Sequence, residues 1–150
     1  MRIAVAQMNS VLGDLSGNVR QILEIARRAE AEGTDVLLTP ELSLCGYPPE
    51  DLLLRPDFYR SVDLALADLA RETTDLDMAI VVGHPEQAGS HCYNAATVLL
   101  QGKRLGTYRK QHLPQYEVFD ELRYFTPGND TVTFDYAGVR FGLAICEDIW

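Results

Sequence analysis

The stretch Val36-Leu37-Leu38-Thr39-Pro40-Glu41 decides the fold of this chain. Val36 to Thr39 form a short apolar run, which is typical of a strand buried on both faces of a sheet. Pro40 ends the run, since proline has no backbone N–H to donate to a neighbouring strand. Strands of this kind occur in α/β proteins, where helices cover the sheet, and the flanking sequence agrees with that class.

The residues before this strand predict a first strand and a first helix. Residues 1–8 (MRIAVAQM) form an apolar run that is interrupted too early for a signal-peptide core, so we interpret it as a buried strand. A loop rich in turn-forming residues follows. Apolar side chains then recur at helical spacing at Val19, Ile22, Leu23 and Ala26, and Gly33 stands where such a helix would end.

The residues after Glu41 begin with a long loop. The segment from Leu44 to Phe58 holds too many helix and strand breakers for a regular element, so we expect a loop with at most a short turn of helix. After this loop, apolar residues at helical spacing predict a second amphipathic helix, marked by Tyr59, Val62, Leu66, Leu69 and Ala70. A third strand is predicted from Met78 to Gly83.

The second half of the chain predicts two hairpins. One joins Tyr93–Leu100 to Arg104–Tyr108, and the other joins Thr131–Tyr136 to Val139–Ile145. Hairpins following alternating strands and helices imply a mixed sheet. We find no internal repeat and no linker, so the chain is one domain or part of one.

Composition narrows the class of protein. With 150 residues, 47% apolar and 23% charged, the chain can build an ordinary globular core. Its formal charge of −9 repels nucleic acid and anionic lipid, and no span reaches the roughly 20 apolar residues of a membrane helix. Three cysteines without a C-x-x-C spacing argue against disulfides and structural zinc, so we expect a cytoplasmic protein without a metal site.

Three residues with reactive side chains follow predicted strands. Glu41, Lys110 and Cys146 each stand where an apolar run ends, and we expect these to be central strands of a sheet whose functional groups gather at one edge. If each residue is considered alone, the simplest interpretation is a solvent-exposed acid for Glu41, a surface lysine for Lys110 and a buried cysteine for Cys146. Together they suit acyl transfer, in which a carboxylate takes the thiol proton and an ammonium stabilises the oxyanion.

A cysteine–histidine pair is the competing arrangement, and we rate it lower. His84 follows a predicted strand and could line the same edge, whereas His91 falls in a turn-like stretch and His112 follows Lys110. Cys45 and Cys92 lack a strand end with an acidic turn behind it, so we interpret both as structural.

Four motifs resemble the nitrilase superfamily of carbon–nitrogen hydrolases. They are residues 1–8, Pro40-Glu41-Leu42, Lys110 with Leu113-Pro114, and residues 144–150 (AICEDIW), in the order and spacing of that family. The resemblance covers the whole chain. It implies an α-β-β-α sandwich with mixed sheets, of which residues 1–150 are the N-terminal part.

Two longer stretches, 41–54 and 108–125, are similar to the glutaminase domains of glutamine-dependent NAD synthetases. This resemblance implies Glu41 as base, Lys110 as oxyanion partner and Cys146 as nucleophile. It also implies a glutamine site near Tyr47, Tyr116 and Phe119, with Glu121 as a supporting carboxylate. Gln115 departs from the pattern, because such enzymes usually have Asn after the Leu-Pro pair.

The implied activity is hydrolysis of L-glutamine through a thioester on Cys146. Ammonia would pass to a synthetase domain, absent from this chain, that uses ATP and Mg to amidate nicotinic acid adenine dinucleotide. The resemblance implies no cofactor in residues 1–150 and a homo-oligomeric enzyme, although these residues alone are expected to be poorly soluble, oligomeric or inactive. The alternatives are an amidase for another small amide and a catalytically silent scaffold.

Overall fold

The computed structural model describes residues 1–150, and the strand predicted after Asp35 lies inside its larger sheet. This strand, β2 (Val36–Leu38), pairs in parallel with β1 (Ile3–Val5) on one side and β3 (Ala79–Ala88) on the other. Two antiparallel strands, β4 (His91–Leu100) and β5 (Lys103–Arg109), complete the order β1-β2-β3-β4-β5. The predicted mixed sheet is therefore confirmed.

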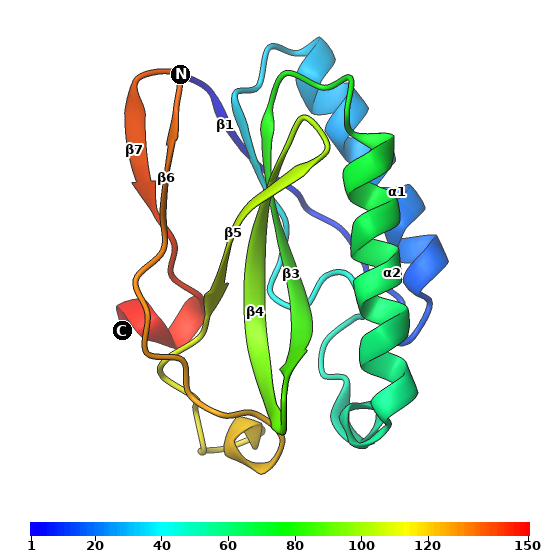
Figure 1. Cartoon of the computed structure of the whole chain (residues 1–150), viewed down its shortest axis with the longest axis vertical. Coiled ribbons are helices and arrows are strands. Elements are labelled where there is room, and N and C mark those ends of the chain that lie inside the picture. The colour runs from blue at the N-terminus through cyan, green and yellow to red at the C-terminus, as the bar shows by residue number, and fades with distance from the viewer.

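Both predicted helices are present, and they lie together on one face of this sheet (Figure 1). Helix α1 (Leu15–Ala31) begins after Asp14, whose carboxylate accepts a hydrogen bond from the backbone N–H of Gly17. Helix α2 (Pro56–Glu72) begins with proline in its first turn, where no backbone hydrogen bond is lost. Their apolar faces pack with those of β2, β3 and β4 into the main hydrophobic core.

The second hairpin forms a separate layer. Strands β6 (Thr133–Tyr136) and β7 (Val139–Gly142) pair only with each other, and Phe134 stacks on Phe141 at 5.0 Å. A smaller core joins this hairpin to the sheet face opposite the helices; its buried members are Val36, Ala79, Val81, Ala96, Val98, Tyr108, Phe134 and Ile145. The chain thus builds an α layer, a β layer and the start of a second β layer.

Several predicted boundaries were wrong by a few residues. β1 ends at Val5 rather than Met8, and β7 ends at Gly142 rather than Ile145. β3 instead continues past Gly83 to Ala88, because β4 pairs with it along that whole length. The loop after Leu44 holds the expected short turn, a 3₁₀ helix over Glu50–Leu54. No helix is both long and apolar enough to cross a membrane.

The expectation that all three reactive residues follow central strands was also wrong. Glu41 follows β2, which is inside the sheet, but Lys110 follows the edge strand β5 and Cys146 follows β7 of the other sheet. Sequence alternation predicts a hairpin without telling which sheet the hairpin joins. The three residues therefore meet where the second layer closes over the first.

Candidate active site

The turn that carries Glu41 packs directly on β3. A Cβ atom at Gly83 would lie 2.5 Å from the carbonyl oxygen of Pro40 and 2.6 Å from the amide nitrogen of Leu42, so only glycine fits there. The backbone N–H of Leu44 donates to the carbonyl of Gly83 at 3.0 Å. These contacts hold Glu41 at the end of β2 with only 20% of its side chain exposed.

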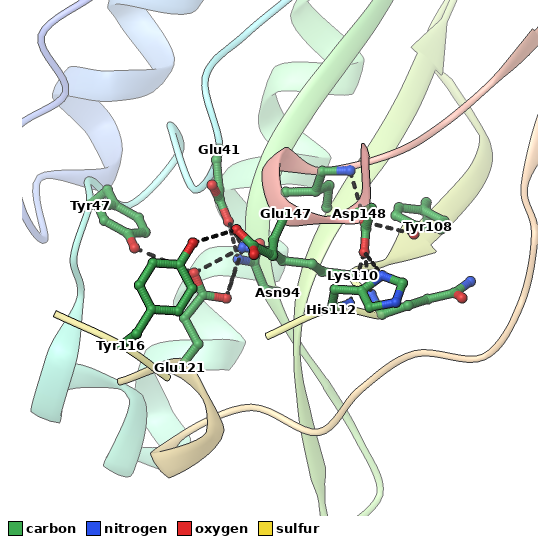
Figure 2. A network of polar contacts seen from close by, with 12 residues as sticks. Glu41, Tyr47, Asn94, Tyr108, Lys110, His112, Tyr116, Glu121, Glu147 and Asp148 are labelled. Carbon is green, nitrogen blue, oxygen red and sulfur yellow. Dashed lines mark hydrogen bonds and ion pairs between the residues drawn. The ribbon is translucent and has the colours of Figure 1, made fainter. Parts of the chain in front are cut away.

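Lys110 is held by both its backbone and its side chain. Its backbone N–H donates to the carbonyl of Asn94 at 2.8 Å, and its own carbonyl accepts from Gly128 at 2.8 Å. The side chain is fully buried. Its Nζ donates to Glu41 Oε1 at 2.7 Å and to the two carboxylate oxygens of Glu121 at 2.9 and 3.0 Å (Figure 2).

One ammonium and two carboxylates form this cluster, and the pKa values of Lys110 and Glu121 are both raised. Burial by itself lowers the pKa of Lys110, but the hydrogen bonds and charges of Glu41 and Glu121 outweigh it, so that the pKa is raised overall. Burial raises the pKa of Glu121, and the nearby Glu41 charge adds to this, while Lys110 opposes it. Lys110 is therefore a cation at neutral pH.

Cys146 begins a short 3₁₀ helix, Cys146–Ile149, with a φ of 47° in the left-handed region. It is exposed, and it lines a cavity of about 290 Å³ together with Glu41, the end of β2 and the interior of β3. Burial raises the pKa of the Cys146 thiol and the Glu41 carboxylate raises it further, whereas Lys110 lowers it. The sulfur is mostly thiol at neutral pH and needs a base to react.

Asp148 ties the Cys146 turn to the segment around Lys110. Its carboxylate is only 4% exposed, and burial raises its pKa less than its hydrogen bonds lower it, so the pKa falls below the usual value. It accepts four hydrogen bonds, from the backbone N–H groups of Gln111, His112 and Ile145 and from the hydroxyl of Tyr108 (Figure 2). One acid thus joins two segments that are remote in sequence.

Asn94 is a member of the cluster that the sequence analysis missed. Its side chain is buried and its Nδ2 donates to Glu41 Oε1 at 2.6 Å and to Glu121 Oε2 at 3.4 Å. The available signal was a polar amide at the start of the buried run Asn94–Leu99 of β4. A buried amide needs a partner, but sequence does not say which.

Of the predicted substrate residues, Glu121 belongs to this cluster, and Tyr47 and Tyr116 lie beside it (Figure 2). The hydroxyl of Tyr47 donates to Glu121 Oε1 at 3.4 Å, and the hydroxyl of Tyr116 donates to Glu147 at 2.8 Å. The rings of Tyr116 and Phe119 meet edge to face at 5.7 Å. A cavity of about 310 Å³, bordered by Tyr47 and Glu121, adjoins the cluster.

Gln115, the departure from the family pattern, braces the loop that carries Glu121. Its amide nitrogen donates to Asp120, and its amide oxygen accepts from the backbone N–H of Leu122 at 3.1 Å. Glutamine at this position therefore supports the short 3₁₀ helix Glu121–Arg123 from outside the cluster.

The cysteine–histidine alternative finds no support in the geometry. His84 is buried on the helix side of the sheet, where its Nε2 bonds to Thr97 at 2.7 Å and burial lowers its pKa. His91 is exposed, but it opens β4 rather than lying in a turn as expected. His112 is exposed and faces Asp148 at 3.4 Å.

The other two cysteines have structural surroundings. Cys45 is fully buried, and burial raises the pKa of its thiol to about 12, while Cys92 is half-buried against the main core. No group of three or more His, Cys, Asp or Glu side chains is arranged to hold a metal ion.

Comparison with solved structures gives the same fold. The glutamine-dependent NAD⁺ synthetase of Acinetobacter baumannii superposes with a TM-score of 0.88 at 38% identity, over 99% of this chain and 28% of that one. An amidase from Nesterenkonia sp. superposes with a TM-score of 0.84 at 27% identity, over 99% of this chain and 56% of that one. An acrylamide adduct at the active-site cysteine is known for a variant of the Nesterenkonia amidase.

Sequence comparison extends the match to the whole chain. The glutamine-dependent NAD⁺ synthetase of Thermotoga maritima is 44% identical over 150 residues, all of this chain and 26% of the relative. That of Xanthomonas campestris is 46% identical over 153 aligned residues, all of this chain and 27% of the relative. The chain thus spans about a quarter of the length of these relatives. The family model for carbon–nitrogen hydrolases matches residues 2–150, so this chain belongs to the carbon–nitrogen hydrolase family.

Proposed function

We propose that this chain is the N-terminal portion of a glutaminase domain that hydrolyses L-glutamine to glutamate and ammonia. The observation that carries the proposal is the contact of Lys110 with Glu41 and Glu121, beside a cavity that Glu41 shares with Cys146. The relatives from Thermotoga maritima and Xanthomonas campestris are glutamine-dependent NAD⁺ synthetases, which favours glutamine as the amide.

The first half of the reaction forms a thioester. Glu41 accepts the thiol proton of Cys146 while the sulfur forms a bond to the side-chain amide carbon of glutamine. The carbonyl π electrons move to oxygen, and the Lys110 ammonium stabilises the resulting oxyanion. When the tetrahedral intermediate collapses, the carbon–nitrogen bond breaks, and Glu41 returns its proton to the departing nitrogen as ammonia.

The second half of the reaction releases glutamate. Glu41 accepts a proton from a water molecule, whose oxygen attacks the thioester carbon, and Lys110 again stabilises the oxyanion. The carbon–sulfur bond then breaks and the proton returns to Cys146. Both halves use one base and one cation, which suits a cluster whose members are already in contact.

The substrate residues have separate roles in this proposal. Tyr47, beside Glu121, and the paired rings of Tyr116 and Phe119 border the position of the glutamine backbone. Glu121 does not react; it keeps Lys110 charged and in place. We place ATP and Mg²⁺ in a synthetase domain of the full-length protein, which would be a homo-oligomer, and no cofactor in residues 1–150.

The test is a comparison of Cys146→Ala with the unaltered full-length protein. Glutamine-dependent release of ammonia is expected to fall to the background rate, with the circular dichroism spectrum unchanged. Synthesis from added ammonia should continue, because it bypasses the thioester. Ammonia release by the Ala variant at the unaltered rate would refute the proposal.

An amidase acting on another small amide is the second candidate, favoured by the likeness to the Nesterenkonia amidase. A substrate panel separates the two. We expect kcat/KM for L-glutamine to exceed the values for acetamide and propionamide by at least about 100-fold, because the simple amides lack the charged groups of the glutamine backbone. The reverse order would support the amidase.

A further inference from the structure

The side chain of Asn94 stands between the two carboxylates that bind Lys110. It comes from the interior of β4, 53 residues from Glu41 in the chain, and only 1% of the residue is exposed. Its orientation is not open to exchange of the amide atoms, because both nearby groups are carboxylate oxygens, which accept hydrogen bonds from Nδ2.

The other end of the carboxamide has no partner. Asn94 Oδ1 is buried and accepts no hydrogen bond, which costs stability for a polar atom removed from water. A residue that served only the stability of the fold would be expected to satisfy both ends of its amide. Asn94 instead donates from Nδ2 to Glu41 and Glu121 and leaves Oδ1 without a partner.

The two bonds to Glu41 use the same oxygen. Lys110 Nζ and Asn94 Nδ2 both donate to Oε1, at 2.7 and 2.6 Å, and Oε2 takes part in no hydrogen bond. Two donors on one oxygen fix the rotation of the carboxylate plane, whereas one donor would leave it free to turn. Oε2 is therefore the oxygen available to accept a proton.

From these contacts we propose that Asn94 is a positioning residue, which locks the Glu41 carboxylate so that Oε2 serves as the general base for Cys146. The proposal rests on the proposed function in assigning the base role to Glu41. Asn94 touches neither sulfur nor substrate in this scheme and acts only through Glu41. As a neutral donor it also bridges Glu41 and Glu121 without adding charge to the cluster.

Replacing the side chain of Asn94 tests its role without removing its backbone hydrogen bond. The carbonyl of Asn94 accepts the backbone N–H of Lys110 at 2.8 Å, and a side-chain substitution leaves that bond in place. Thr97 is a matched control on the same strand: it is fully buried and bonds to His84 and Thr107 on the face toward α2. Thr97→Val removes buried hydrogen bonds of the strand without touching the cluster.

The experiment measures glutamine hydrolysis by the full-length protein carrying Asn94→Ala or Thr97→Val. For Asn94→Ala we expect kcat to fall about 10- to 100-fold, as misplaced catalytic groups do, with KM changed less than about threefold. Thr97→Val should keep kcat within about twofold even if its melting temperature falls. Unchanged kcat in the Ala variant, or a loss confined to KM, would overturn the proposal.

A double-mutant cycle shows whether Asn94 acts through Glu41. The rate of Cys146 alkylation by iodoacetamide is measured for the unaltered protein, Asn94→Ala, Glu41→Gln and the double variant. Asn94→Ala should change the rate severalfold with Glu41 present and less than about twofold with Gln at position 41. Equal changes in both backgrounds would mean that Asn94 acts independently of Glu41.

Two further cases are a variant that does not fold and a protein that does not hydrolyse glutamine. Where Asn94→Ala does not fold, Asn94→Leu replaces it, because it keeps a branched side chain, removes the donor without adding charge and is expected to show the same loss of kcat. If the unaltered protein does not hydrolyse glutamine, the proposed function fails, but the alkylation cycle still decides whether Asn94 and Glu41 are coupled.

Discussion

The backbone N–H of His112 donates to Asp148 Oδ1 at 2.8 Å, and this bond joins the segment after Lys110 to the turn that begins with Cys146. The same carboxylate also binds the backbone N–H of Ile145, directly before the cysteine. A single buried acid therefore sets the position of the sulfur relative to the Lys110 cluster. Three of the four donors to this carboxylate are backbone N–H groups, and the fourth is the hydroxyl of Tyr108.

Replacing Asp148 should loosen this connection. Asp148→Asn keeps the shape but exchanges an acceptor for an NH₂ group, which faces donors, and we expect a loss of about 2–3 kcal/mol in the free energy of unfolding. Urea denaturation measures it. Asp135→Asn is the control, because its ion pair with Arg140 is exposed and should contribute less than about 1 kcal/mol. Equal losses in the two variants would contradict the buried role of Asp148.

The contribution of Asp148 should also depend on pH in one direction. Its folded pKa is lowered, mainly by hydrogen bonds that outweigh burial, so it stays ionised in the folded protein after it is protonated in the unfolded chain. The stability gap between the unaltered protein and Asp148→Asn should be constant above the unfolded value of about 3.9 and shrink as the pH falls below it. Urea unfolding at pH 7, 5 and 3 would reveal the trend, and a gap that widens in acid would disprove it.

Removing the cation should damage folding and activity together. Lys110→Met leaves Glu41 and Glu121 facing each other without a counter-charge, and we expect a loss of about 3–5 kcal/mol in the free energy of unfolding. Adding Glu121→Gln removes one of the two charges and should restore part of the stability but none of the glutaminase activity. If the second substitution brought no recovery, charge repulsion would not be the cause.

The three cysteines should differ sharply in reactivity. Iodoacetamide is expected to modify Cys146 first, because this side chain is exposed, whereas Cys45 is buried with a pKa of about 12. The rate at Cys146 should rise from pH 7 to pH 9, since its thiol pKa is raised above the usual value. Peptide mass mapping locates the label, and modification of Cys45 ahead of Cys146 would overturn the assignment of the nucleophile.

The ring of Tyr116 should matter more than its hydroxyl. Tyr116→Phe keeps the edge-to-face contact with Phe119 and loses only an exposed hydrogen bond to Glu147, so KM for glutamine should change less than about twofold. Tyr116→Ala removes the ring and should raise KM about tenfold or more, with a smaller effect on kcat. Steady-state kinetics of the matched pair test this; similar KM values for both variants would place the substrate elsewhere.

Much of the architecture could be predicted from the chain alone. The helical spacing of apolar residues located α1 and α2, and uninterrupted or alternating runs located the strands and both hairpins. Glu41, Lys110 and Cys146 stood out because each has a reactive side chain directly after such a run. Each of those patterns lies within a few consecutive residues, so it can be recognised without knowledge of the fold.

The assembly of the site was decided only by the tertiary structure. The bond between Asn94 and Glu41 and the bonds that Asp148 makes to Gln111 and His112 join segments from 36 to 53 residues apart, and a buried amide or acid in sequence carries no mark of its partner. Likewise, alternation predicted the β6–β7 hairpin but not that it begins a second sheet. The physical reason is that hydrophobic periodicity determines which face of an element is buried, whereas packing between elements determines what that face meets.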